Sequence, residues 1–336
     1  MPLLSISLSH EQIEQLLNHQ DIIIDVRVND ATPAECRKIS FFQLFHEEIR
    51  RQERNGCLRT SETYRVAYRK FWIFCHCRDI YADSIDAEMM ESYQGFLRSQ
   101  NLSLNTISFY MRILRTVYKK AVEHGMTTDR QPFGRVYTGQ AKTAKRAISI
   151  EELRRIHELE IEDRHARFAR DLFIFSFMTR GMSFVDIAYL RPSDIRNGVL
   201  TYKRRKTGQL ISMQWEQEMQ DIVERYPLPR RRPYLLPIIR QQNGKERNQY
   251  RHIQSEVNRQ LKTVAQMAGI SQNLTMYCAR HSWASIARQM QVPLEVISRG
   301  MGHTHERTTE IYLKSISSTA IDQANRQIME LLEVGK

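Results

Sequence analysis

The sequence predicts a mainly α-helical protein with a small β-hairpin or sheet, divided into an N-terminal helical domain and an α+β domain. Apolar residues recur at steps of three and four along much of the chain after residue 40, which is the period of an amphipathic helix. Two short β-prone runs, 199–202 and 210–213, flank Lys206-Thr207-Gly208, which is typical of a hairpin tip. Residues 127–148 lack helical periodicity, so we expect them to link the two domains.

The N-terminal part of the chain predicts a short separate segment followed by four helices. Residues 1–35 form the segment, in which 22–28 favours a short strand. Within residues 36–126, helices are expected from about Ser40 to Arg54, from a cap at Thr60 through Cys77, from Ala87 to Arg98, and from Ser103 to His124, before Gly125. The apolar face of the last helix consists of Ile107, Met111, Leu114, Val117, Tyr118 and Ala121.

Basic residues cover the other side of that last helix and continue into the linker. We expect six of them to contact the phosphates of a nucleic acid, because an extended basic surface can follow a phosphate backbone. For any single one of these charges, a solvated surface position is the alternative. The six are Arg112, Arg115 and Lys119 on the helix, and Lys142, Lys145 and Arg146 in the linker.

The second domain, residues 149–336, begins with a capping box formed by Ser149 and Glu152. The strongly apolar stretch from Arg167 to Met182 predicts a buried central helix, and the hairpin follows it. Further helices are expected near 251–268, 275–289 and 293–299, with an amphipathic tail over 320–332.

Composition limits the class of protein. The chain of 336 residues has 50 Lys+Arg against 38 Asp+Glu, a net charge of +12, which attracts a polyanion. Its five scattered cysteines predict reduced thiols and a cytoplasmic location, because nothing resembles an export signal. We expect no metal, no cofactor and no membrane span, since neither zinc-ligand spacing nor a long apolar run is present.

Four chemically distinctive residues occur in a fixed order along this basic chain. Lys206 sits at the hairpin tip, Arg280 opens Arg280-His281-Ser282-Trp283, His303 follows Gly302, and Tyr312 comes nine residues later. Cations that hold a phosphodiester and a hydroxyl that attacks it would need this set of side chains. The ordered set resembles the tyrosine recombinase family, also called the phage integrase family, over about residues 36–330.

The resemblance implies a role for each of these residues. Tyr312 would be the nucleophile that forms a 3′-phosphotyrosyl intermediate, and Arg280 would hold the phosphate. His303 would face a nonbridging oxygen or the tyrosine, and Lys206 would protonate the departing 5′ oxygen. Residues 36–126 would be the core-binding domain and residues 149–336 the integrase-type catalytic domain.

Two positions depart from the family pattern. The family arginine three residues before the acidic residue Asp186 is replaced by Ser183, which carries no charge. Arg204, on the same strand face as Lys206, and Arg180 are the candidate substitutes, with Arg204 preferred. The family histidine three residues before Arg280 is replaced by Tyr277. These departures resemble those of recombinases from Bacteroides-type bacteria.

The function implied by the resemblance is site-specific DNA recombination, by integration, excision or inversion. Two domains would clamp double-stranded DNA, four copies would pair two sites, and accessory DNA-bending proteins could assist. Religation of a phosphotyrosyl ester would need neither ATP nor a metal. The alternative is a catalytically degenerate DNA-binding relative, motivated by Ser183 and Tyr277. A metal-dependent nuclease is disfavoured because no carboxylate cluster lies near the motif.

Overall fold

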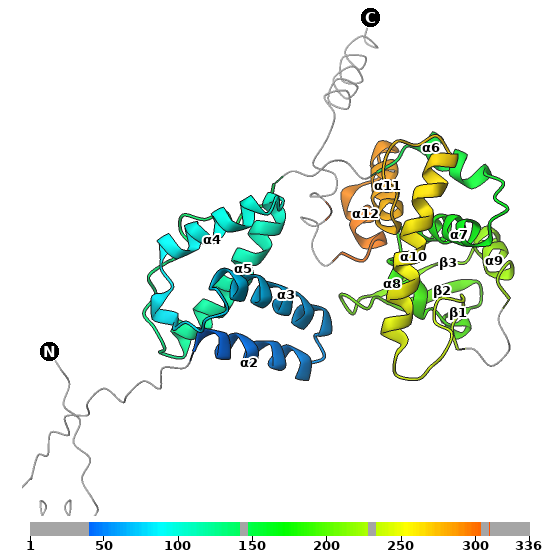
Figure 1. Cartoon of the computed structure of the whole chain (residues 1–336). Helices are drawn as coiled ribbons and strands as arrows, with labels where there is room; N and C mark the ends of the chain where they lie inside the picture. Colours follow the sequence, from blue (N-terminus) through cyan, green and yellow to red (C-terminus); the bar gives the residue numbers. More distant parts are fainter. Residues whose placement is uncertain (1–39, 142–146, 228–232, 304–308, 310–336) are drawn as a thin grey trace, which may run out of the picture. The chain divides into compact units, whose positions relative to one another are not determined.

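The computed structural model describes residues 40–141, 147–227, 233–303 and Thr309, which belong to two compact units. The first unit ends at Thr143 and the second begins at Ala144 (Figure 1). Several predicted features lie outside the described residues. These are the strand over 22–28, the tail helix over 320–332, Lys142, Lys145, Arg146 and Tyr312.

The first unit is helical, as predicted. Its α-helices are α2 (Phe41–Arg54), α3 (Leu58–Phe74), α4 (Ala87–Ser99) and α5 (Leu104–Glu123), with a 3-10 turn, η1 (Ala82–Ser84). Three of them have side-chain caps, because Ser40, Asp86 and Ser103 accept hydrogen bonds from backbone N–H groups of the first turn.

The boundaries of α3 differ from those predicted. The helix begins at Leu58, so Thr60 lies inside it and does not cap it. It ends at Phe74, because His76 and Cys77 have left-handed backbone conformations (φ +55° and +56°) that no helix can continue.

An aromatic cluster forms much of the core of this unit. Phe42 contacts Tyr68 and Trp72 edge-on, and Phe71 contacts Tyr93 in the same way, with ring centroids 5.0 Å apart. All six residues of the predicted apolar face of α5 are buried against this cluster. The helical period of the sequence therefore identified the core side of α5 correctly.

Residues 127–141, the first part of the expected linker, pack on α5. Phe133 and Val136 are buried in the core of the helical unit. The side-chain amide of Asn105 bonds both the N–H and the carbonyl of Ala141, and Ser108 Oγ donates to Gly139 O at 2.6 Å. These bonds fix the stretch to the first unit up to residue 141.

The second unit surrounds a buried helix, α7 (Arg164–Met178), which packs against α10 (Glu246–Met267) and α11 (Met276–Gln289). Leu172, Phe173 and Phe175 of α7 are fully buried, as the apolar stretch predicted. The remaining elements are α6 (Ile150–Glu158), α8 (Phe184–Tyr189), a 3-10 turn, η2 (Pro192–Asp194), β1 (Ile195–Arg196), β2 (Val199–Lys203), β3 (Leu210–Gln214), α9 (Gln217–Glu224) and α12 (Leu294–Gly300).

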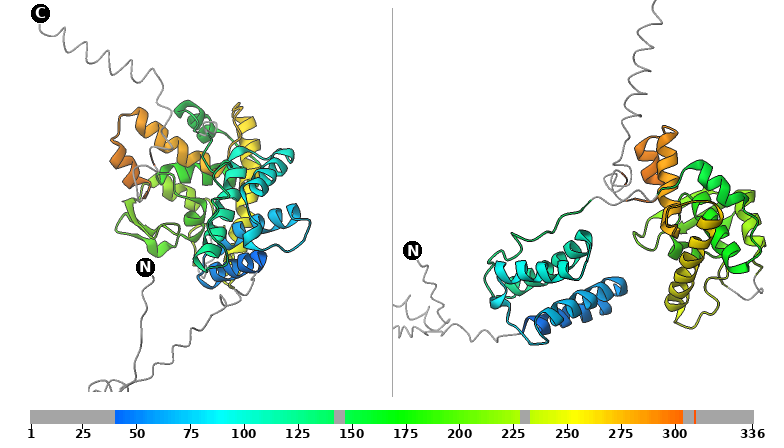
Figure 2. Two further views of the ribbon diagram at one scale, coloured as in Figure 1. Left: turned by 90° about the vertical axis from the view of Figure 1, so that its left-hand side faces the viewer. Right: turned by 45° about the horizontal axis from the view of Figure 1, so that its top comes forward.

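Strands β1, β2 and β3 form an antiparallel sheet in that order, and Tyr202 faces Ile211 across the predicted hairpin. The two-residue strand β1 was not predicted, since a run of that length has no periodicity. Both views in Figure 2 show α11 and α12 side by side, consistent with their contacts. None of the helices in the described ranges combines the length and apolarity that a bilayer crossing needs.

Candidate active site

The end of α7 begins the site. The predicted central helix stops at Met178 instead of Met182, because Arg180 and Gly181 both adopt left-handed conformations (φ +59° and +72°). Their N–H groups bond Phe177 O and Ser176 O, which is a Schellman C-cap. A Cβ on Gly181 would lie 2.7 Å from Cα of Arg280, so only glycine lets the two segments approach this closely.

Arg280 is held rigidly at this crossing. It is 4% exposed, and its guanidinium donates to Gly181 O at 2.7 Å and to Met301 O at 2.6 Å. A buried guanidinium bound to two carbonyls keeps its charge at a fixed place, as an anion site requires.

His303 completes a line of hydrogen bonds from Arg280. A Schellman C-cap at the end of α12, with Gly302 at φ +64°, presents the histidine. Nη2 of Arg280 lies 2.9 Å from its Nε2, and its Nδ1 lies 2.7 Å from Thr309 Oγ1. Because arginine only donates, Nε2 of His303 accepts a hydrogen bond from Arg280. Nδ1 therefore carries the ring proton and donates a hydrogen bond to Oγ1 of Thr309.

The surroundings of His303 keep its ring neutral. Burial, together with the positive charges of Arg280, Arg204 and Lys206, lowers the pKa of His303 to about 4. Three cations therefore act on this one ring, and they come from two separate parts of the sequence.

Arg204 lies against the same turn. It is 7% exposed and donates from Nη1 to Gly302 O. A Cβ on Gly302 would lie 3.3 Å from Cδ of Arg204 and 2.5 Å from Cδ1 of Ile211, so these side chains would have to move, and the positive φ of Gly302 also favours glycine. Lys206 follows in the exposed turn of the hairpin, two residues beyond Arg204.

Arg180, the other candidate substitute, is less closely connected to this cluster. It is half-buried and makes a long hydrogen bond of 3.4 Å to Ser212 O on β3. Its charge is not among those that lower the pKa of His303.

Ser183 and Asp186 connect the start of α8 to the hairpin. Ser183 Oγ donates to Asp186 Oδ2 at 2.6 Å, and Asp186 Oδ1 accepts from the backbone N–H of Arg205 at 2.9 Å. The guanidinium of Arg205 stacks 3.7 Å above the ring of Tyr189. The sequence did not predict these contacts of Arg205, the residue next to Lys206, because they join residues that are distant in the sequence.

The other predicted residues occupy separate positions. Tyr277 is 43% exposed and contacts the ring of His281 edge-on, with centroids 4.5 Å apart. Arg112 and Lys119 are exposed on α5. Arg115 is half-buried, and it donates to Phe133 O at 3.0 Å. The structure thus brings Arg280, His303 and Arg204 together, with Lys206 beside them.

Buried arginines around a histidine, beside a basic hairpin, form a cationic cluster whose chemistry suits an anion. Comparison of the sequence with known families identifies the class of protein. Residues 40–136 match the phage integrase SAM-like domain, and residues 149–318 match the phage integrase family. The second match covers more than half of the chain. The chain belongs to the phage integrase family and is a site-specific tyrosine recombinase.

Solved structures of recombinases share the fold. The chain is similar to a lambda integrase dimer bound to a COC′ core site, with a TM-score of 0.63, 14% identity and coverage of 90% of this chain and 83% of that one. The integrase of transposon Tn1549 in complex with transposon right end DNA gives a TM-score of 0.62, 15% identity and coverage of 88% and 100%.

A third similar structure is the XerH recombinase bound to a palindromic difH substrate. Its TM-score is 0.56, with 20% identity and coverage of 85% of this chain and 84% of that one. No curated protein matches the sequence.

Proposed function

We propose that this recombinase cleaves and rejoins DNA strands through a covalent bond between Tyr312 and a 3′ phosphate. The observation that supports this assignment is the bond between His303 Nδ1 and the buried hydroxyl of Thr309. Tyr312 follows Thr309 by three residues, so the backbone between them spans at most about 10 Å. Its phenol is therefore within reach of the cationic cluster.

In the proposed reaction, the Tyr312 oxygen attacks phosphorus and the bond from phosphorus to the 5′ oxygen breaks. Arg280 and Arg204 stabilise the charge on the nonbridging oxygens. When Nη2–H of Arg280 donates its hydrogen bond to the phosphate instead of to His303, the Nε2 lone pair of His303 becomes available to accept the tyrosine proton. Lys206 gives a proton to the 5′ oxygen, and religation reverses each step.

Arg204 is our choice for the positive charge that Ser183 cannot supply. Its Nη1 binds the carbonyl of the residue next to His303, and its charge acts on the histidine ring. Within the described residues, the guanidinium of Arg180 bonds Ser212 O on β3 instead. The hydroxyl of Ser183 donates to Asp186, and Asp186 in turn binds the hairpin at Arg205, so Ser183 helps to position the hairpin.

The substrate, the assembly and the cellular location are inferred from membership of the phage integrase family. We infer double-stranded DNA as the substrate, with Arg112 and Lys119 as backbone contacts and four copies on two paired sites. The solved relatives include a lambda integrase tetramer bound to a Holliday junction, which supports this assembly. We further propose chemistry without metal or ATP in the cytoplasm, assistance by DNA-bending proteins, and membership of the Bacteroides-type subgroup, because of Ser183 and Tyr277.

A nicked suicide substrate tests the proposal. Loss of the short fragment after cleavage should trap a covalent adduct, and Tyr312→Phe should bind the same DNA without forming it. Trapping should persist in EDTA. Binding without any adduct in the unmodified protein would favour the alternative, a degenerate DNA-binding relative. An adduct that survives Tyr312→Phe would assign the nucleophile elsewhere.

A further inference from the structure

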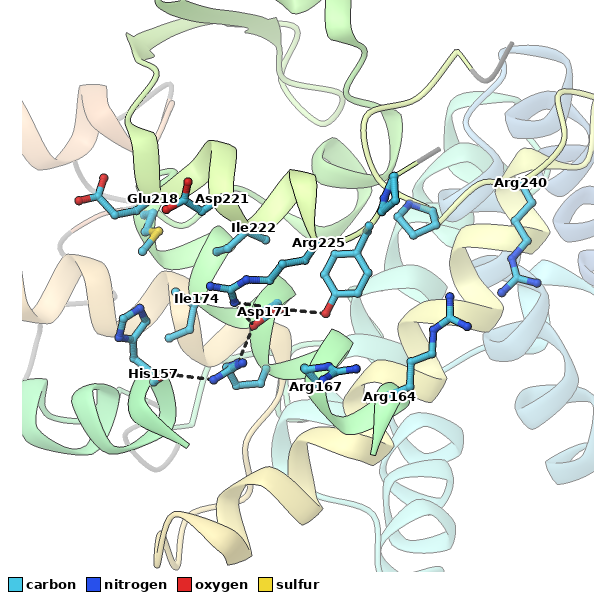
Figure 3. Close-up of a pocket in the computed structure, with 15 residues that line it drawn as sticks. His157, Arg164, Arg167, Asp171, Ile174, Glu218, Asp221, Ile222, Arg225 and Arg240 are labelled. Atoms are coloured by element: carbon cyan, nitrogen blue, oxygen red, sulfur yellow. Dashed lines mark hydrogen bonds and ion pairs between the residues drawn. The ribbon is translucent and has the colours of Figure 1, made fainter. Parts of the chain in front are cut away.

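The second unit has a hollow that the recombination chemistry does not use. It measures about 1040 Å³ and lies between α7, α9 and the segment that precedes α10 (Figure 3). One face of α7 lines it from Arg164 to Met178. At about 1.5 Å per residue, Arg164 lies roughly 20 Å along the helix from the end that adjoins the catalytic cluster.

One wall of the hollow is a completed ion-pair network. Asp171 is 1% exposed and accepts from Arg170 Nε at 2.5 Å, from Arg225 Nη1 at 3.3 Å and from Tyr226 Oη at 2.8 Å. Arg170 also donates to His157 O at 2.9 Å and to Leu159 O at 2.8 Å. The charges and hydrogen-bonding groups of this network have partners within it, so the network forms a rigid wall of the hollow.

Three further arginines line the hollow without such a partner. Arg164, Arg167 and Arg240, the arginine triad, are exposed and form no ion pair with any carboxylate of the described ranges. Figure 3 shows Arg164 and Arg240 extending toward one another from two different elements.

The lining of the hollow carries an excess of positive charge. Five arginines and three carboxylates line it, and Asp171 already pairs with Arg170 and Arg225. The N-cap Asp163 bonds the N–H of Ala166 at the start of α7, so the excess charge comes from the arginines and not from the helix end. The like charges of the triad repel one another, which a bound anion would relieve.

We propose that the arginine triad binds a compact polyphosphate, either free or as the phosphate chain of a nucleotide. Guanidinium groups match phosphate oxygens with paired hydrogen bonds, and several of them suit a ligand with several phosphates. Glu218 and Asp221 line the opposite end of the hollow and would repel a continuous DNA backbone. A short anion avoids them, and its binding breaks no phosphate bond.

The walls of the hollow also distinguish the two sources of the ligand. Ile174, Ile222, Tyr226 and Pro227 give an apolar lining beside the cations. A nucleoside could pack there, so ATP should bind more tightly than tripolyphosphate if the base is recognised. Equal affinity would mean that the phosphate chain alone is bound, and both results agree with the proposal.

Calorimetric titration of the full chain with sodium tripolyphosphate and with ATP, in EDTA, tests this site. We expect one ligand per chain and at least tenfold weaker binding in the combined variant Arg164→Gln, Arg167→Gln, Arg240→Gln. The matched control removes three exposed arginines outside the hollow, by Arg154→Gln, Arg196→Gln and Arg288→Gln. The control should bind as the unmodified protein does.

Three outcomes would overturn the proposal. They are no binding at millimolar ligand, an equal loss of affinity in both triple variants, and displacement of the ligand by duplex DNA, which would assign the triad to DNA. Covalent trapping by Tyr312 is measured separately, so failure of either idea leaves the other open to its own test. Melting curves of both triple variants confirm that they are folded.

Discussion

Nη2 of Arg280 lies 2.9 Å from Nε2 of His303, and this single contact fixes the protonation state of the site. A guanidinium cannot accept a hydrogen bond, so the histidine ring must be neutral with its proton on Nδ1. The Nδ1–H group donates a hydrogen bond to Oγ1 of Thr309, which is the described residue nearest to Tyr312 in the sequence. Arg280, which we propose binds the phosphate, and Thr309, three residues before the proposed nucleophile Tyr312, are therefore connected through one ring.

Loss of the Thr309 hydroxyl should disturb this connection. Thr309→Val removes the acceptor for Nδ1–H while keeping the volume, and we expect about tenfold less covalent trapping, equivalent to about 1.4 kcal/mol. Thr309→Ser retains the oxygen and should trap at nearly the normal rate. Equal rates in the two variants would separate Thr309 from catalysis.

The lowered pKa of His303 makes stability depend on pH. The unfolded chain binds a proton at its histidine near the usual value of about 6.5, whereas the folded protein does so only at about 4. The free energy of unfolding should therefore fall as the pH is lowered from 6.5 to 4. Urea titrations at several pH values measure this slope, which His303→Gln should reduce. An unchanged slope would contradict the buried neutral ring.

Replacement of the two candidate arginines should have unequal effects. Arg204→Ala should lower the trapping rate by about 10² to 10³, the range for loss of one oxyanion donor. Arg180→Ala should lower it less, since the guanidinium of Arg180 bonds Ser212 O on β3, at the long distance of 3.4 Å. Melting temperatures of both variants control for misfolding. The reverse order of rates would transfer the role to Arg180.

Gly181 and Gly244 form a matched pair for testing how closely the chain approaches Arg280. Both have positive φ angles, +72° and +76°, but a Cβ meets Arg280 only at Gly181 and open space at Gly244. Gly244→Ala should cost about 1–2 kcal/mol of stability, from the left-handed conformation alone. Gly181→Ala should cost more and abolish trapping. Chemical denaturation and the suicide substrate measure the two effects.

The stacking of Arg205 on Tyr189 should affect cleavage by positioning Lys206, the next residue in the hairpin. Tyr189→Leu removes the ring that holds the hairpin, and we expect slower cleavage of normal DNA. A substrate with sulfur in place of the 5′ bridging oxygen has a leaving group that needs no proton, so it should restore the rate.

Two controls complete the sulfur experiment. Lys206→Ala should respond to sulfur as Tyr189→Leu does, whereas Arg280→Ala should remain slow with both substrates. A Tyr189→Leu protein that is equally slow on both would indicate general damage to the unit.

The elements with strong local signals were predictable from the sequence. The period of three and four identified α5 and its buried face, and Ser149 with Glu152 identified the start of α6. The predicted ends of α3 and α7 were wrong, because non-glycine residues, His76 and Cys77 after α3 and Arg180 after α7, adopt left-handed conformations. Such conformations depend on tertiary packing, which local propensity does not record.

The same distinction holds for the site. Residue order along the chain suggested Lys206, Arg280 and His303 because family patterns preserve chemistry at fixed spacing. The bond of Asp186 to the backbone of Arg205 joins segments that are far apart in sequence, and the ring beneath Arg205 has no motif. Supports of this kind become visible only when the chain is folded.

The guanidinium of Arg280 bonds carbonyls at residues 181 and 301, on either side of it in the chain. A nascent or truncated polypeptide that lacks residue 301 cannot complete this arrangement. On the proposed mechanism, DNA cleavage is thereby postponed until synthesis has passed the last of these segments. Incomplete chains would then bind DNA at most, and leave its strands intact.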